Sequence, residues 1–501
     1  MGRIVFGGSL LGLLLTTMRA GDWTKITTPH FTVFSEASEG RTRDWAVEFE
    51  LFRRGLAHVV TVDAAQSGPV TLVLFGSDRR LKPFKPLEKG KPSRVAGYFV
   101  RIAERNMIAL SVAGARDDVR EVIYHEGVHW YLAGLDRRPP VWLEEGLAEV
   151  FGTFALHGNA FSYGNPRPDY VRLIRVMSPM PMTRLAELSR GTMRYNGAHE
   201  STARLFYAQS WAVVHQLMFD DALKGREALQ RLLHRSMDAN DSDEAIEAAM
   251  GCSYAETDAR LNDYLLRRSY QRQQIPFNRA EIDAGFSLQP VEDSEVDLVL
   301  GGLLLGVERP DEAAPYLRRA AGARFEDPSP WELLGQMEWM QGHRAEAASY
   351  FEQALVRGSR SAVTHLYLGQ SELAPGMLSR GTIQSAASHF AAAIHANPRH
   401  EIAYEGLATT TTMLRDEAGA ETEALLRQGE QRFPANPRLQ LALAMTELKS
   451  GKSETAGRRL QRVLASPDLD NPTAAFTREL VAEWERKAEG AKAHATARST
   501  P

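Results

Sequence analysis

Residues 125–129 read His-Glu-Gly-Val-His, and Glu145 follows sixteen residues after the second histidine. On a helix, His125 and His129 emerge one turn apart on the same face, so both imidazoles can bind one ion. Two imidazoles and one carboxylate leave one coordination position open, which is typical of catalytic zinc sites rather than structural ones. Glu126 adjoins the first histidine, where its carboxylate can act as a base. These residues predict a catalytic zinc centre carried by two helices.

The two predicted helices have local support in the sequence. Apolar residues at 119–123 form a stripe ahead of the first histidine, and the two prolines at 139–140 break the chain and can start a second helix. On that second helix Glu145 and Glu149 share one face. Gly127 lies inside the first helix, where glycine costs about 1 kcal/mol relative to alanine. We therefore expect a neighbouring backbone to approach the helix closely at Gly127.

The stretch Trp-Leu-Glu-Glu-Gly-Leu-Ala-Glu at 142–149 resembles the third-ligand helix of the gluzincin metallopeptidases, the clan that includes thermolysin and the zinc aminopeptidases. Residues 23–35 resemble the first strand of one branch, the peptidase MA-like family, and residues 207–215 resemble one of its later helices. The resemblance spans roughly residues 23–268, about half of the chain. It implies an α+β gluzincin-like metallopeptidase domain, with a small mixed sheet and helices, over residues 23–270.

The resemblance also implies roles for particular residues. His125, His129 and Glu145 would be the zinc ligands, and Glu126 would polarise the zinc-bound water as general base. Glu149, one turn after the third ligand, matches a carboxylate that steadies a ligating histidine in related enzymes. The cofactor that these residues imply is Zn²⁺.

Tyr207 begins a Tyr-x-x-Ser segment that resembles the Tyr-x-x-Gly of zinc aminopeptidases, in which the tyrosine hydroxyl stabilises the oxyanion. Tyr195 and His199 are substitutes if Tyr207 points into the core. Plain core packing is the alternative for Tyr207, because the surrounding helix is apolar.

Structural alternatives exist for other residues of the predicted site. Glu145 could be a solvated helix carboxylate, with the two histidines only flanking a packed helix, and Glu149 could form a surface salt bridge. We expect His30 and His215 to have structural roles. The basic stretch 79–94 is expected to be a solvated loop between strands, with a place along the cleft as the alternative.

The connection between the second histidine and Glu145 is shorter than in thermolysin or the aminopeptidases, yet it still allows two antiparallel helices to meet. No Gly-x-Met-Glu-Asn segment, which holds a free substrate amine in the aminopeptidases, precedes the zinc helix. Instead, residues 107–112 form a strand candidate by composition. In the clan such an edge strand pairs with an extended peptide substrate. Endopeptidase action on a peptide or protein substrate is therefore expected.

The first twenty residues read as an export signal. Arg3 supplies the positive start, residues 4–15 form a short apolar run, and Ala20 is a possible cleavage site. An uncleaved membrane anchor is the alternative, and no other segment is apolar enough to cross a bilayer. Export predicts a periplasmic or otherwise extracytoplasmic protein. The single Cys252 excludes an intrachain disulfide, and a net charge of −4 gives no reason to expect nucleic acid as a partner.

The second half of the chain repeats at close to 34 residues, the period of tetratricopeptide helix pairs. For example, Ala313 and Ala347 lie 34 residues apart, each at a helix position where a neighbouring helix touches. The pattern resembles the tetratricopeptide family and predicts an all-α solenoid of about five repeats over residues 294–485. Residues 271–293 are expected to be a linker, and the tail 486–501 is expected to be disordered.

Strands are predicted at 31–35, 70–75, 95–102 and 106–112, and a helix at 44–60. Together they form a small mixed sheet ahead of the zinc helix.

Two functional hypotheses follow. In the first, the protein is an exported zinc endopeptidase whose repeats recruit a protein partner or substrate. In the alternative, it is a tetratricopeptide adaptor that carries a catalytically idle metallopeptidase-like domain. Chance motifs in a purely helical scaffold are disfavoured by the strand-rich first hundred residues.

Overall fold

The fold is described from a computed structural model, which covers residues 22–61, 68–102, 104–113, 116–135, 139–190, 200–220, 225–234, 243–283, 285–374, 376, 378–415, 419–466 and 469–498. The predicted export signal at 1–20 lies outside these residues, as do Tyr195 and His199. Among the helices in the described ranges, none is both long enough and apolar enough to cross a membrane.

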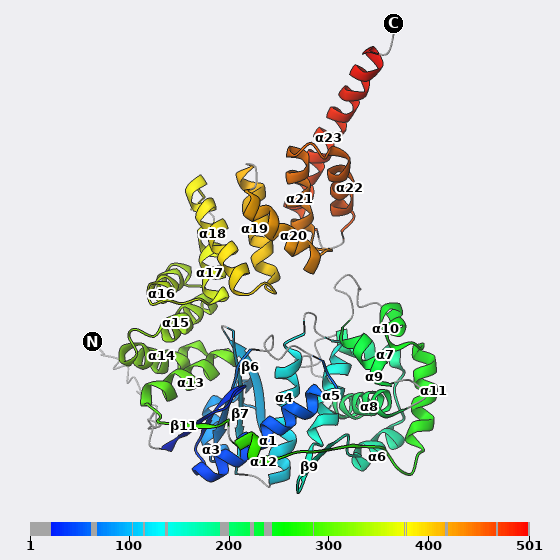
Figure 1. Ribbon diagram of the computed structural model, residues 1–501, viewed down its shortest axis with the longest axis vertical. Coiled ribbons are helices and arrows are strands. Elements are labelled where there is room, and N and C mark those ends of the chain that lie inside the picture. Colours follow the sequence, from blue (N-terminus) through cyan, green and yellow to red (C-terminus); the bar gives the residue numbers. More distant parts are fainter. Residues whose placement is uncertain are drawn as a thin grey trace, which may run out of the picture.

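A six-stranded mixed sheet forms the centre of the N-terminal half (Figure 1), with strand order β11-β1-β2-β3-β7-β6. The three middle strands β2, β3 and β7 run parallel, and the outer neighbours pair antiparallel. The strands are β1 (Thr24–Thr27), β2 (Phe31–Ser35), β3 (Val70–Phe75), β6 (Gly97–Ile102), β7 (Arg105–Ser111) and β11 (Ser287–Gln289). Four of them lie at or close to the predicted positions, so the expected mixed sheet is confirmed.

The position of the edge strand was predicted wrongly. The strand expected at 107–112 is β7, and it pairs with β3 on one side and with β6 on the other. β6 is the outer strand, because a tight turn that includes Glu104 at φ 63° folds it back alongside β7. Within the described residues the two outer strands of this sheet are β11 and β6, and β6 is the one that lies next to α4.

The two faces of the sheet belong to different hydrophobic cores, as the alternation of β3 demonstrates. Leu72 and Leu74 pack into a core with α1 (Glu39–Ala57) and α4 (Arg116–Leu132). Val73 and Phe75 point to the opposite face, where they share a core with α13 (Asp293–Gly306) of the first repeat. A strand buried on both faces accounts for the continuous apolar run of β3.

The predicted linker is part of the folded N-terminal half rather than a free connection. Within residues 271–293, β10 (Gln273–Pro276) pairs with β9 (Ala160–Tyr163), and β11 pairs with β1. The predicted boundary at residue 270 is therefore too early, because the sheet needs both β11 and the first repeat to complete it. β8 (Ala155–His157) completes the smaller sheet, and the short helix α12 (Arg279–Asp283) lies between β10 and β11.

The basic stretch 79–94 is more ordered than a solvated loop. It contains α3 (Asp78–Leu81), the 3-10 helix η2 (Lys82–Phe84), and the paired strands β4 (Leu87–Glu88) and β5 (Lys91–Pro92). Arg309 of the first repeat donates hydrogen bonds to the carbonyl oxygens of Pro83 (2.7 Å) and Lys85 (2.9 Å). This stretch therefore packs against the repeats and does not line the candidate site described below.

Helices complete the N-terminal half. The principal one is α8 (Glu200–Phe219), which packs closely on α5 (Val141–Gly152) and lies beside it in Figure 1. The remaining helices are α6 (Pro168–Met177), α7 (Met182–Arg190), α9 (Gly225–Leu233), α10 (Asp243–Met250) and α11 (Tyr254–Leu265).

Five consecutive helix pairs form the C-terminal half and rise away from the sheet as a curved stack (Figure 1). The pairs are α13 with α14 (Pro310–Ala323), α15 (Pro328–Met340) with α16 (Arg344–Val356), α17 (Ala362–Glu372) with α18 (Arg380–Ala396), α19 (Glu401–Leu414) with α20 (Ala420–Arg432), and α21 (Pro437–Lys449) with α22 (Ser453–Leu464). The predicted all-α solenoid is thus confirmed, and in the first three pairs the second helix contacts a glycine of the first helix. A Cβ at Gly335 would lie 2.6 Å from the ring of Phe351.

The tail does not follow the prediction of disorder. Helix α23 (Asn471–Arg498) continues through most of residues 486–501. The alanine, lysine, glutamate and arginine residues of this segment are strong helix formers, which gives a physical reason for the continuation.

Candidate metal centre

Three donor atoms from α4 and α5 converge at one point. The Nε2 atoms of His125 and His129 lie 3.3 Å apart. The Oε2 atom of Glu145 lies 3.4 Å from the first and 3.6 Å from the second. A tetrahedral zinc with ligands at about 2.0–2.1 Å has ligand-to-ligand distances of about 3.3–3.4 Å. The three residues therefore have the spacing that one tetrahedral zinc ion requires.

The local sequence explains why these side chains meet. His125 and His129 are one turn apart on α4, and Pro140 caps the start of α5, which carries Glu145 back towards them. Both His129 and Glu145 are buried, with 5% and 3% of their surfaces exposed. Buried polar groups are stable only when paired or bound to a metal, so this arrangement fits a metal centre better than the solvated carboxylate considered for Glu145.

A carboxylate orients each histidine from behind. The Nδ1 atom of His129 lies 2.8 Å from Glu144 Oε1, and the Nδ1 atom of His125 lies 3.5 Å from Glu149 Oε1. Such contacts set the tautomer and the ring orientation of metal-binding histidines. Sequence reasoning pointed to Glu149 but missed Glu144, although Glu144 immediately precedes the third donor within the same motif.

Glu149 does not form a surface salt bridge. Its carboxylate is buried and accepts hydrogen bonds from the Tyr170 hydroxyl (2.8 Å) and from Arg167 Nη1 (3.2 Å). Burial raises the pKa of Glu149, while the charges of His125 and Arg167 act in the opposite direction. These partners hold the carboxylate that contacts His125.

The electrostatic field at the three donors favours positive charge. Burial lowers the pKa of His129, but hydrogen bonds to Glu144 and Glu145 outweigh it and raise that pKa to about 10. The pKa of His125 is raised in the same way, with burial opposed mainly by Glu145. The two histidines in turn hold the pKa of Glu145 well below its usual range, despite burial. A cation between these groups is therefore electrostatically favoured.

Glu126 is held by the outer strand of the sheet. Its Oε2 atom accepts a hydrogen bond of 2.9 Å from the backbone N–H of Phe99 in β6. One carboxylate oxygen is thereby fixed by the strand next to the helix that carries both histidines. This arrangement suits a residue that takes up a proton in a defined orientation.

Tyr207 lines a cavity next to the donor atoms. The cavity has a volume of about 270 Å³ and is bounded by His125, Glu149, Asp169, Tyr170, Leu173, Arg204 and Tyr207. Phe206, the neighbouring residue on α8, is buried in the core instead. Tyr207 thus lines the cavity, and its side chain also packs against the core.

A close helix contact places α8 beside the donors. A Cβ at Gly146 would lie 2.5 Å from the backbone oxygen of Ser210. Glycine after Glu145 therefore lets α5 and α8 approach at backbone distance, and this contact places Tyr207 near the metal-binding face. Gly127 of α4 also lies at a close contact, but aromatic rings approach it rather than the expected backbone. A Cβ at Gly127 would lie 2.5 Å from the ring of Phe52.

The two remaining histidines that we singled out form hydrogen bonds outside the cavity. The Nδ1 atom of His30 lies 3.0 Å from Glu50 Oε1. Buried His215 contacts the Tyr264 hydroxyl (2.6 Å) through Nδ1 and the Gly164 carbonyl (2.9 Å) through Nε2. These contacts are consistent with the structural roles expected for both.

Comparison with known proteins adds a family for part of the chain. Residues 120–238, which include the candidate metal centre, match a family described as a protein of unknown function (DUF1570). No curated protein is similar enough in sequence to match this chain.

Several solved structures are similar to this chain. They include YrrB, described as a TPR protein with an unusual peptide-binding site (15% identity, 36% of this chain and 90% of that chain covered, TM-score 0.30). MamA 41-end from Desulfovibrio magneticus RS-1 has 18% identity, covers 35% of this chain and 97% of its own, and has a TM-score of 0.28. Pseudomonas aeruginosa pilF has 14% identity, with 39% of this chain and 89% of that chain covered, and a TM-score of 0.28. TM-scores this low carry no argument, so the repeat architecture rests on the helix pairs described above.

Proposed function

We propose that this protein is a zinc-dependent peptidase that cleaves internal peptide bonds. The observation that carries the proposal is the triangle of donor atoms of His125, His129 and Glu145, whose edges of 3.3, 3.4 and 3.6 Å match a tetrahedral ion. When bound, zinc supplies Lewis acidity and makes water easier to deprotonate.

The residues around the donors supply the remaining functions of hydrolysis. Glu126 takes a proton and passes it to the leaving amine, while the N–H of Phe99 holds its second oxygen. Tyr207 donates a hydrogen bond to the oxygen on which negative charge develops. Glu144 and Glu149 keep the two imidazoles in their binding orientation.

Export is a further part of this proposal, and it rests on the sequence of residues 1–20 alone. Arg3 followed by the apolar run at 4–15 supports it. In this proposal the repeats recruit a protein partner or substrate outside the cytoplasm.

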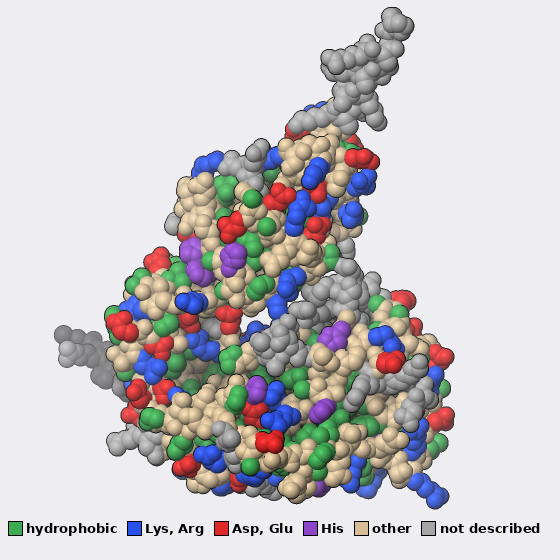
Figure 2. Space-filling model, viewed as in Figure 1, with side chains coloured by type: hydrophobic (Ala, Val, Ile, Leu, Met, Phe, Trp, Pro, Cys, Tyr) green, Lys and Arg blue, Asp and Glu red, His purple; other side chains and the backbone are tan. Residues whose placement is uncertain are grey.

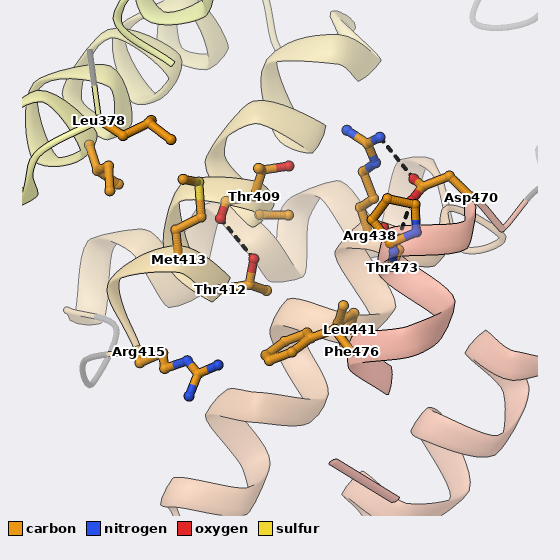
Figure 3. Close-up of a pocket in the computed structure, with 13 residues that line it drawn as sticks. Leu378, Thr409, Thr412, Met413, Arg415, Arg438, Leu441, Asp470, Thr473 and Phe476 are labelled. Atoms are coloured by element: carbon orange, nitrogen blue, oxygen red, sulfur yellow. Dashed lines mark hydrogen bonds and ion pairs between the residues drawn. The ribbon is translucent and has the colours of Figure 1, made fainter. Parts of the chain in front are cut away.

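A repeat adaptor with an idle metal centre is the second candidate, and a groove in the repeats favours it. The groove has a volume of about 740 Å³ and lies between α19, α21 and α23 (Figure 3). Met413, Leu441 and Phe476 provide apolar surface, while Arg438 pairs with Asp470 at one side. An adaptor would use this groove without any need for chemistry at the metal centre.

The test compares the full-length parent with Glu126→Gln in metal analysis and in a cleavage assay on an unfolded protein. A peptidase gives one zinc per chain in both proteins and cleavage only in the parent. Glu187→Gln is the matched control, because Glu187 is an exposed carboxylate that pairs only with Arg184 in the described structure. Absence of bound zinc at neutral pH contradicts the proposal, and equal, negligible cleavage by parent and Glu126→Gln favours the adaptor.

A further inference from the structure

The cavity beside His125 contains a cation without a counter-ion. Arg204 of α8 lines this cavity together with Tyr170 and Tyr207. Its side chain is exposed, and it forms no hydrogen bond or ion pair in the described part of the chain. A guanidinium that lines a cavity and has no protein partner can bind a carboxylate ligand there.

The acidic residues of the same cavity have direct partners other than Arg204. Arg167 donates to Glu149 (3.2 Å) and forms two contacts with Asp169, at 3.4 and 3.3 Å. Tyr170 supplies a further hydrogen bond to Glu149. Arg167 also pairs with Glu121 (2.6 Å). Neither acidic residue of the cavity forms an ion pair with Arg204 in the described part of the chain, and a bound zinc ion would add positive charge there. The guanidinium of Arg204 is therefore available to a carboxylate ligand.

We propose that Arg204 binds a carboxylate of the substrate and so selects peptides that carry an acidic group close to the scissile bond. This inference rests on the proposed peptidase function and names the substrate class of the same centre. A guanidinium matches a carboxylate with two parallel hydrogen bonds, which give orientation as well as attraction. Arg204 is thus a specificity-determining residue.

Helix geometry sets the distance between this carboxylate and the reacting bond. Arg204 and Tyr207 are three residues apart on one face of α8, which corresponds to ~4.5 Å along the helix axis. An extended peptide advances ~3.3 Å per residue. If Tyr207 contacts the reacting carbonyl, the acidic group lies one or two residues away. It can be an Asp or Glu side chain or the C-terminal carboxylate of a short product-side segment.

The first test measures binding without turnover. The probes are fluorescent peptides that carry Glu or Gln at each of two positions on either side of one candidate cleavage site, with a free or an amidated C-terminus. Each peptide is titrated into the full-length Glu126→Gln protein. We expect at least one Glu peptide or free C-terminus to bind about tenfold more tightly than its neutral counterpart, because a hydrogen bond to a charged group contributes about 1.5–3 kcal/mol. The pair that differs identifies the source of the carboxylate. Equal binding throughout overturns the inference.

Variants at two arginines make this test specific. Arg204→Glu, made in the Glu126→Gln protein, should invert the preference so that peptides with Lys at the same position bind more tightly than those with Glu. Arg172→Glu is the matched control, because Arg172 of α6 is also exposed and unpaired in the described chain but does not line the cavity. An unchanged preference in Arg204→Glu, or an equal change in Arg172→Glu, overturns the inference.

The results distinguish failure of the peptidase proposal from failure of the inference about Arg204. Absence of cleavage by the parent, together with Arg204-dependent binding of acidic peptides, contradicts the peptidase and supports only the binding of a carboxylate by Arg204. Cleavage of acidic and neutral peptides at equal rates by the parent, unaffected by Arg204→Glu, supports the peptidase and overturns the role of Arg204.

Discussion

The backbone N–H of Phe99 donates a hydrogen bond of 2.9 Å to the carboxylate of Glu126. This bond joins the outer strand of the sheet to the helix that carries both candidate histidine ligands. On the other face of the same strand, Val100 packs against the first repeat. The contact is close, because a Cβ added at Gly306 of that repeat would lie 2.7 Å from the Val100 side chain. The orientation of Glu126 therefore depends on a strand that the repeats help to hold.

Removal of the Phe99 donor should slow hydrolysis. Phe99→Pro deletes the N–H, and an outer strand tolerates proline at positions whose N–H points away from the sheet. We expect kcat/KM to fall about tenfold or more relative to Phe99→Ala, which keeps the N–H, because a hydrogen bond to a charged group is lost. Zinc content and the thermal midpoint identify proteins that remain folded. Equal kcat/KM in the two variants would show that the bond does not orient Glu126.

Glu144 should control zinc affinity. In Glu144→Gln the amide is a weaker partner than the carboxylate for Nδ1 of His129, which now lies 2.8 Å from Glu144. Loss of such a contact typically lowers metal affinity about 10–100-fold. Competition with a chromogenic chelator measures this change directly, without any substrate. An affinity equal to that of the parent would mean that Glu144 does not steady His129.

Tyr207 should act on the rate rather than on the metal. Tyr207→Phe retains the ring that lines the cavity and removes only the hydroxyl, so zinc binding should stay unchanged. Loss of an oxyanion donor costs about 100-fold or more in kcat. Tyr170→Phe is the contrasting variant, because its hydroxyl bonds Glu149 and should affect zinc affinity instead. An unchanged kcat in Tyr207→Phe removes the proposed role.

His215 should make the protein less stable in acid. Burial lowers the pKa of His215 to about 4, against about 6.5 in the unfolded chain. Between these values the unfolded state binds a proton that the folded state does not, so the free energy of unfolding falls as the pH drops from about 6.5 to 4. The loss approaches about 3 kcal/mol at the acid end and is absent above pH ~7.

The free energy of unfolding in urea is measured for the parent and for His215→Gln across this pH range. The variant should be less stable at neutral pH, because it loses two buried hydrogen bonds. Its stability should nevertheless depend less steeply on pH. Parallel curves for the two proteins would assign the acid sensitivity to other groups.

Two glycine substitutions should change stability in opposite directions. Gly127→Ala places a methyl group 2.5 Å from the ring of Phe52 and 2.9 Å from that of Phe49, and overpacking of this kind costs about 1–3 kcal/mol. Gly40→Ala in α1 meets nothing within 4 Å and should stabilise the helix by about 0.5–1 kcal/mol. Thermal unfolding of both variants checks the prediction, and stabilisation by Gly127→Ala would contradict it.

Much of the architecture could be predicted from local patterns. The 34-residue period located the helix pairs, since each repeat must bury the same face against its neighbours. The apolar run of β3 and the alternation in β2 located the strands. The candidate metal ligands could also be identified, because i and i+4 spacing on a helix brings His125 and His129 together whatever surrounds them.

Other features depend on contacts between segments far apart in the sequence. The predicted linker and the predicted domain boundary were wrong because the sheet has two apolar faces, and the second is covered by the first repeat. The edge strand was misplaced because strand order is not encoded in the composition of a strand. The tail was misjudged because a scarcity of apolar residues does not prevent helix formation in a sequence rich in helix formers.

The sequence by itself therefore determined which residues are candidate metal ligands and which segments repeat, because both depend on short, regular spacings along one helix or one period. Only the tertiary structure decided that Glu144 contacts His129, that Phe99 holds Glu126, and that Arg204 faces the cavity beside His125. These relationships join side chains across α4, α5, α6, α8 and β6, and their physical basis is the packing of separate elements rather than the order of residues within any one of them.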